Sequence, residues 1–194
     1  MKRVAVAVWL AAMSAVGASD GGANLLKNGS FEGGARYWFC ETDAEAVRGD
    51  AAHGEYALRL PKGLVQSAAF LLQPGKPVTI SFSAKADSEM TIGWQCTPCG
   101  REIGAKAGMT WGLKGAHSVK IGKEWKRYTA TFTPNVAQDG FWPRPTYMLQ
   151  LGDSDKPVWF DAVTVAYGAG ADEYVSQREV EVQVNCPELK GYRS

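Results

Sequence analysis

The side chains that most often carry catalysis are sparse in this chain and do not form a recognisable motif. There are only two histidines, His53 and His117, and they stand in the loop-like contexts Ala-His-Gly and Ala-His-Ser. The sequence holds no GxSxG nucleophile elbow, no HExxH zinc motif and no phosphate-binding P-loop. The acidic residues fall mostly in predicted turns, where carboxylates usually cap turns and meet water. The sequence therefore predicts a protein that is not an enzyme.

The four cysteines, Cys40, Cys96, Cys99 and Cys186, suggest a disulfide. An even number of cysteines favours disulfides in an oxidising compartment, although a zinc site and free thiols remain alternatives. Cys96 and Cys99 are separated by two residues, so a bond between them is the simplest pairing. No βαβ pattern surrounds them, which argues against a redox enzyme.

The first 18 residues have the pattern of a secretory signal. Lys2 and Arg3 precede an apolar run, and small residues follow it at positions 16–18. The run is too short to span a bilayer, so we expect an exported protein, extracellular or periplasmic. The formal net charge of +1 gives no electrostatic reason to expect nucleic acid or a membrane as a partner.

The rest of the chain predicts an all-β protein. Short runs rich in β-branched and aromatic residues alternate with Gly, Pro, Asn and Asp, and no amphipathic helix is apparent. The strands are predicted at residues 25–31, 56–60, 64–72, 78–85, 90–95, 125–133, 147–151 and 158–167. Many short strands at this spacing are typical of an antiparallel β-sandwich or barrel, here with a single core.

Two regions depart from this pattern. Residues 97–115 are long and glycine-rich, which predicts an excursion between strands. Residues 168–172 have the composition of a linker, and Val180, Val182 and Val184 alternate with polar residues after it. We therefore expect one domain over residues 24–167, and a linker over 168–194 with a possible first strand of a further domain.

An ordered series of segments carries a resemblance to a known family. It consists of residues 24–32 (NLLKNGSFE), 53–60 (HGEYALRL), 72–75 (LQPG), 80–85 (ISFSAK), 124–129 (EWKRYT) and 160–163 (FDAV). This series resembles the carbohydrate-binding modules of families 4, 9 and 22, which are appended to secreted polysaccharide-degrading enzymes. The chain departs from the family at Ala162, where the last motif usually has a second Asp, and at residues 97–115, which have no counterpart.

The resemblance implies a jelly-roll β-sandwich of the galactose-binding-like kind. We expect the protein to be a monomer. Such modules bind a polysaccharide or oligosaccharide in a cleft on one concave sheet, without catalysis. Strand alternation leaves Ser81, Ser83, Gln95 and Gln150 on polar faces, where they can hydrogen-bond sugar hydroxyls. Gln150 falls where some family members place a binding Gln, and Gln66 is a further candidate.

Sugar binding also needs flat apolar surfaces, and the seven tryptophans could supply them. Trp9 belongs to the signal. Strand parity and family position assign Trp38, Trp94, Trp125 and Trp159 to core or scaffold. Trp111 and Trp142 stand in predicted loops and are therefore the expected sugar platforms.

The resemblance also implies a structural calcium ion. Its carboxylate ligands would be Glu32 and Asp161, with backbone carbonyls from around Ser30 and Glu55. Hard cations such as Ca²⁺ prefer oxygen ligands of these two kinds. The missing second Asp at Ala162 removes one ligand that the family often has.

Two other functions stay open on the sequence. The same sandwich can serve as a structural or protein-binding domain once its sugar cleft is lost, because a fold does not fix a function. The valine alternation near the C-terminus also fits the leading domain of a larger glycoside hydrolase. An exposed aromatic on the sheet face that carries Gln150 would favour sugar binding over a purely structural role.

Overall fold

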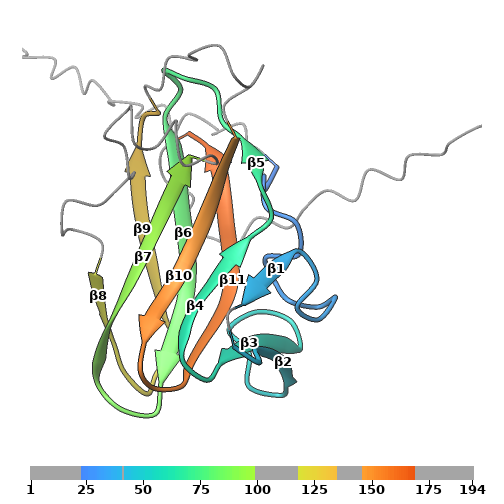
Figure 1. Cartoon of the computed structure of the whole chain (residues 1–194), viewed down its shortest axis with the longest axis vertical. Helices are drawn as coiled ribbons and strands as arrows, with labels where there is room; N and C mark the ends of the chain where they lie inside the picture. Colours follow the sequence, from blue (N-terminus) through green and yellow to red (C-terminus); the bar gives the residue numbers. More distant parts are fainter. Residues whose placement is uncertain (1–22, 41, 99–117, 135–145, 169–194) are drawn as a thin grey trace, which may run out of the picture.

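A computed structural model describes residues 23–40, 42–98, 118–134 and 146–168 (Figure 1). These residues form eleven β-strands in two antiparallel sheets, which confirms the predicted all-β sandwich. In Figure 1, β4, β10 and β7 pass in front of β6 and β11, so the two sheets lie face to face. Within these ranges no helix is long and apolar enough to cross a membrane.

The first sheet has six strands and carries the three predicted binding glutamines. Its order is β1-β4-β10-β7-β8, and β5 also pairs with β10. The strands are β1 (Trp38–Cys40), β4 (Gly63–Ser67), β5 (Phe70–Leu71), β7 (Met90–Pro98), β8 (Ser118–Ile121) and β10 (Thr146–Ser154).

The second sheet has five strands in the order β2-β3-β11-β6-β9. They are β2 (Glu45–Arg48), β3 (Tyr56–Leu60), β6 (Val78–Ala86), β9 (Lys126–Phe132) and β11 (Val158–Tyr167). The central strands β6 and β11 are buried along nearly their whole length, on both faces. Ser81, Ser83 and Thr164 are therefore buried although they point away from the core between the sheets.

The core lies between the sheets, where alternate side chains of each strand meet. Tyr147, Leu149 and Leu151 of β10 are at most 1% exposed, as their alternation predicts. The ring of Phe82 is central, because it lies 5.9 Å from Trp94 and 6.2 Å from Phe160, both in edge-to-face geometry. Aromatic pairs in this geometry stabilise a core beyond their buried area.

The predicted first strand at residues 25–31 does not form. Asn28 and Phe31 have φ angles of 54° and 58°, in the left-handed region that interrupts a strand. The segment still lies beside β11, because the Leu25 N–H donates to the Val165 carbonyl and the Val163 N–H donates to the Gly29 carbonyl, both at 2.8 Å. The buried Asn24 side chain bonds both the carbonyl of Val163 and the N–H of Val165.

Other differences concern short strands. The predicted strand at residues 64–72 is divided into β4 and β5, and β1, β2 and β8 were not predicted. These three strands have at most four residues each. Such short segments contain too few alternations to show a period of two in the sequence.

Gly29 should be indispensable for this packing. A Cβ atom at Gly29 would lie 2.0 Å from the Val163 carbonyl oxygen and 3.1 Å from Asn24 Nδ2. We expect Gly29→Ala to lower the free energy of unfolding by about 2–3 kcal/mol, measured by urea denaturation. At Gly122 the nearest atom to an added Cβ is 3.9 Å away. Gly122→Ala is therefore the control, and equal effects of the two substitutions would contradict this account.

Candidate carbohydrate-binding face

Three glutamines from distant parts of the chain form one row across the six-stranded sheet. Gln150 on β10 lies in register with Gln66 on β4 and with Gln95 on β7. Their strand neighbours Val65, Trp94 and Leu149 are buried in the core. Because side chains alternate along a strand, the three glutamines point to the outer face of the sheet. The sheet thus brings together Gln66, Gln95 and Gln150, which we call the amide row.

The amides of the row are linked by hydrogen bonds in a single direction. Gln95 Nε2 donates to Gln150 Oε1, and Gln150 Nε2 donates to Gln66 Oε1 at 2.9 Å. An amide has two N–H donors and an oxygen with two lone pairs. After these bonds the row still has donors and acceptors for a ligand, held in fixed positions.

Phe39 extends the amide row by one strand and was missed in the sequence. It lies on β1 in register with Gln66, and it is 62% exposed. Its neighbour Trp38 is buried, and the Trp38 indole N–H donates to the Asn28 carbonyl at 3.1 Å. Since Trp38 points inward, Phe39 must point outward. The outer face therefore carries an exposed aromatic ring beside the amides.

Two paired glycines lie next to the amide row. Gly152 on β10 pairs with Gly93 on β7, two residues along from Gln150 and Gln95. A Cβ at Gly93 would meet only ordinary contacts, the nearest at 3.6 Å to Asp153 Cβ. A Cβ at Gly152, by contrast, would lie 2.6 Å from the Gly63 carbonyl oxygen and 2.9 Å from Leu60 Cδ2, so close packing requires glycine there.

The two predicted serines lie elsewhere. Ser81 and Ser83 are on β6 in the five-stranded sheet, so they do not share a face with the amide row. Ser81 is fully buried and accepts a hydrogen bond from Arg127 Nη2 at 2.6 Å. Strand alternation was predicted correctly for both residues, but alternation does not tell which of two sheets a strand joins.

Of the tryptophans assigned to core or scaffold, Trp38 and Trp94 are buried. Trp159 is half-buried on the outer face of the five-stranded sheet, between the side chains of Arg59 and Lys85. Its two neighbours in register are these same residues. Trp159 therefore lies outside the core, and of the two predicted roles only the scaffold role fits it. The two cations stabilise the indole by cation–π contacts of 5.8 and 5.5 Å.

Trp111 and Trp142 lie outside the described residues, so their role as sugar platforms stays a prediction. The same holds for the disulfide, because Cys99 is also outside the described residues. Its predicted partner, Cys96, is on β7 with its side chain in the core.

Comparison with known proteins identifies the family. A family model described as "Carbohydrate binding domain" (CBM_4_9) matches residues 23–144, which is more than half of the chain. The chain belongs to this family. No curated protein matched the chain in a separate comparison.

Solved structures support the fold of the carbohydrate-binding domain. One described as "CBM4 structure and function" has a TM-score of 0.53 and 19% identity, and the match covers 74% of this chain and 99% of that chain. The tandem CBM22-1–CBM22-2 structure from Paenibacillus barcinonensis Xyn10C has a TM-score of 0.57 and 14% identity, covering 79% of this chain and 49% of that one. The CBM22-1–GH10 structure from Clostridium thermocellum Xyn10B has a TM-score of 0.51 and 14% identity, and the match covers 75% of this chain and 29% of that chain. At these identities the matches establish the jelly-roll fold and leave the ligand open.

The domain also brings the two predicted calcium carboxylates together. Glu32 Oε1 accepts the N–H groups of Glu55 and Tyr56 at 2.9 and 3.1 Å. Asp161 Oδ2 accepts the His53 N–H at 2.7 Å, on the same loop. Neither carboxylate forms an ion pair with a lysine or arginine of the described residues. Two neighbouring carboxylates without a cation fit the donor set of a hard metal ion.

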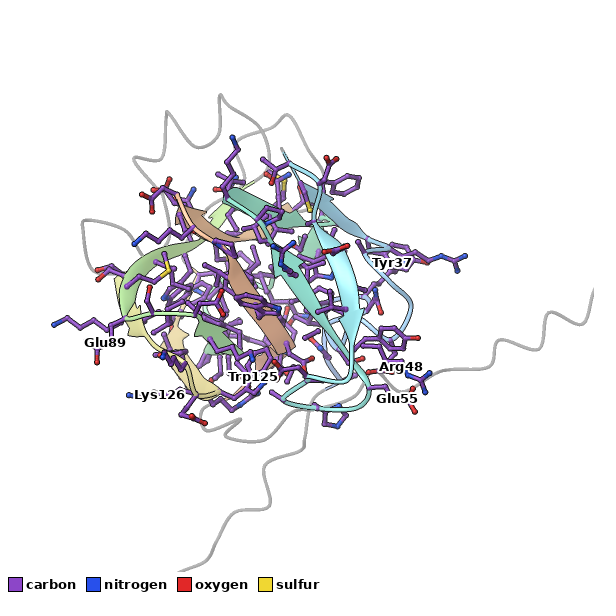
Figure 2. All side chains as sticks on the ribbon, turned by 90° about the horizontal axis from the view of Figure 1, so that it is seen from below. Tyr37, Arg48, Glu55, Glu89, Trp125 and Lys126 are labelled. Atoms are coloured by element: carbon purple, nitrogen blue, oxygen red, sulfur yellow. The ribbon has the colours of Figure 1, made fainter. Side chains whose placement is uncertain are left out.

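The backbone carbonyls predicted as calcium ligands fit the site less well than the two carboxylates. The Glu55 carbonyl accepts the Gly49 N–H at 2.9 Å, and the Glu55 side chain pairs with Arg48 at 2.8 Å (Figure 2). A carbonyl oxygen has a second lone pair, so it can still serve a cation. Ser30 lies in the turn that precedes Glu32. The described residues hold no group of three His, Cys, Asp or Glu side chains for a metal, so backbone oxygens would have to complete this site.

The surroundings of Asp161 raise the pKa of its carboxyl group. Its side chain is fully buried, and burial raises its pKa to about 6, while N–H donors from His53 and Ala162 lower it and the charge of Glu32 raises it. In the metal-free domain Asp161 is therefore mostly protonated below pH 6 and mostly ionised at neutral pH, where its buried charge lowers the stability of the fold.

The raised pKa of Asp161 predicts that the free energy of unfolding depends on pH when EDTA keeps the domain free of metal. Because the folded pKa of about 6 lies above the ordinary value of 3.8, the contribution of Asp161 is full below pH 3.8 and is lost as the pH rises through 6. At about 1.4 kcal/mol per pKa unit, the loss is on the order of 3 kcal/mol. Melting curves from pH 4 to 7.5 should show it, and Asp161→Asn should remove this part of the pH dependence. Identical pH profiles of the two proteins would contradict the assignment.

Proposed function

We propose that the outer face of the six-stranded sheet binds a neutral polysaccharide or oligosaccharide along Phe39 and the amide row. The observation that carries the proposal is the register, which aligns Phe39, Gln66, Gln150 and Gln95 on four adjacent strands. Three strand spacings amount to about 14 Å, enough for a short oligosaccharide to lie across the strands. Membership of a carbohydrate-binding family supports this use of the face.

The chemistry of these four side chains suits a neutral sugar. Each sugar hydroxyl both donates and accepts hydrogen bonds, and so does each amide. The mutual hydrogen bonds of the amides fix their positions before binding, which reduces the entropy lost when a ligand is bound. The exposed Phe39 ring supplies the apolar surface on which the C–H face of a sugar can pack. None of the four carries a charge, so binding should depend little on salt.

The first test is truncation of the face. We expect Gln150→Ala to weaken binding about tenfold, because it removes the central amide and releases both neighbours, at about 1.4 kcal/mol per tenfold. Phe39→Ala should weaken binding by a similar factor through loss of the ring surface. Binding would be measured by affinity electrophoresis and calorimetry with xylan, β-glucan and their hexasaccharides.

The matched control is Gln73→Ala, an exposed glutamine in the β5–β6 connection, outside the row. It should bind like the wild type, and all variants should keep their melting temperatures. Unchanged affinity in Gln150→Ala would exclude the amide row as the site. Retention of the wild type by no glycan at all would instead favour a structural or protein-binding role.

We further propose that Glu32 and Asp161, with carbonyls near Ser30 and Glu55, hold a structural Ca²⁺. The support is the pair of neighbouring carboxylates without a cationic partner, one of them fully buried. A bound cation would neutralise this charge and connect the 52–56 loop to β11 and to the N-terminal segment.

Calcium should therefore stabilise the domain. At one hundred times its dissociation constant a ligand adds about 2.7 kcal/mol, so we expect the melting temperature to rise by about 5–10 °C. Asp161→Asn and Glu32→Gln should abolish the rise. Glu55→Gln should keep it, because only the Glu55 carbonyl is assigned to the site. A rise of equal size in Asp161→Asn would contradict the assignment.

Three wider roles follow as proposals from the sequence. The N-terminal signal pattern supports export, and the near-neutral charge supports a carbohydrate rather than a nucleic acid or a membrane as partner. The domain would then act outside the cytoplasm as a non-catalytic module of a glycan-degrading enzyme. Structural matches such as CBM22-1–GH10 show that this fold occurs beside catalytic modules.

A further inference from the structure

A groove lies at the edge of the sandwich, away from the amide row. It has a volume of about 800 Å³ and lies where the edge strands β8 and β9 meet the β6–β7 turn. Figure 2 shows three of its residues, Glu89, Trp125 and Lys126, on one side of the molecule. The volume is in the range of small-molecule sites, about 300–1,000 Å³. Neither Phe39 nor any of the three glutamines lines it.

One aromatic wall of the groove is held in place by a hydrogen bond. The Tyr128 hydroxyl donates to the Lys120 carbonyl at 2.6 Å, which ties β9 to β8. The Tyr128 ring is therefore positioned before a ligand arrives, which lowers the entropic cost of binding. The Trp125 indole is held instead by Asp50 and Lys85, neither of which lines the groove.

The lining of the groove also carries a small excess of positive charge. Its lining includes Lys120, Lys123 and Lys126 against Glu89 and Glu124. All three lysines are exposed, and none forms an ion pair with another described residue. Lys126 Nζ lies 5.7 Å from the Tyr128 ring, so a cation and an aromatic surface stand side by side. A ligand that fits both must combine an apolar face with a negative charge.

We infer that this groove is a second saccharide site, for an acidic sugar residue that carries a carboxylate or a sulfate. Its ring packs against Tyr128, and its anionic group faces the lysines. The site differs from the amide row in charge, in residues and in position. It would allow one domain to contact a neutral and an acidic glycan segment at the same time.

The test uses the full chain labelled with ¹⁵N. α-1,4-Trigalacturonate should shift the backbone amide resonances of Lys120, Lys123 and Tyr128 with saturation, whereas its fully methyl-esterified form, which has the same sugars without charge, should not. A sulfated galactan oligosaccharide tests whether sulfate replaces carboxylate. Binding should weaken as NaCl is raised from 20 to 300 mM, since exposed charges are screened by salt.

Charge variants give the decisive comparison. We expect Lys120→Gln with Lys123→Gln to weaken trigalacturonate binding about fivefold, and Glu89→Gln to strengthen it by about twofold, since exposed ion pairs contribute about 0.2–1 kcal/mol each. Lys27→Gln with Lys62→Gln makes the same charge change elsewhere and should have no effect. Gln150→Ala should reduce binding of neutral glycans and leave trigalacturonate binding unchanged. Failure of the amide row as a binding site can therefore be distinguished from failure of the groove. Equal binding of the acid and its ester, equal losses in both lysine pairs, or unmoved amide resonances of Lys120, Lys123 and Tyr128 would overturn the inference.

Discussion

The pairing of β10 with both β4 and β7 is the constraint on which the candidate site depends. Gln66, Gln95 and Gln150 are far apart in the chain, and only this register puts them side by side. A shift of one residue in β10 would turn Gln150 into the core and Leu149 out to solvent. Burial of Tyr147, Leu149 and Leu151 opposes that shift, so the same packing that stabilises the sandwich also fixes the amide row.

The two sheets use their outer faces differently. On the six-stranded sheet the row from Phe39 to Gln95 is uncharged, and its amides keep donors and acceptors that the row itself does not use. On the five-stranded sheet Glu45, Arg59, Trp159 and Lys85 also follow one another in register, and they satisfy each other by an ion pair and cation–π contacts. Because both neighbours of Trp159 are cations that lie over its ring, this second row is better suited to holding the sheet together than to stacking a sugar.

Much of this architecture could be predicted from the sequence. The alternation of residues 78–85 and 147–151 gave strands and inward faces that the structure confirms, because each strand is long enough to show the period. The residue types of the three glutamines pointed to hydrogen bonding with hydroxyls. What the alternation lacks is information on which strands become neighbours. Ser81 and Ser83 were therefore grouped with Gln95 and Gln150, although β6 joins the other sheet.

Phe39 shows the same limit, because it joins the amide row although the sequence did not predict it. It stands in a three-residue strand, and its exposure is decided by the burial of Trp38, whose indole N–H bonds the Asn28 carbonyl. Residues 25–31 read as a strand because they are apolar, yet left-handed conformations at Asn28 and Phe31 turn the chain so that Glu32 reaches the loop near Asp161. Local patterns cannot show such contacts, which depend on tertiary packing.

The central claim is that the amide row contacts the sugar, and the side-chain amide resonances of the glutamines test it most directly. In a ¹⁵N-glutamine-labelled sample titrated with a neutral hexasaccharide that the domain retains, the amide signals of Gln66, Gln95 and Gln150 should shift together with one dissociation constant. The signal of Gln73 should stay in place. Saturable binding that leaves all three amides of the row unmoved would contradict the account.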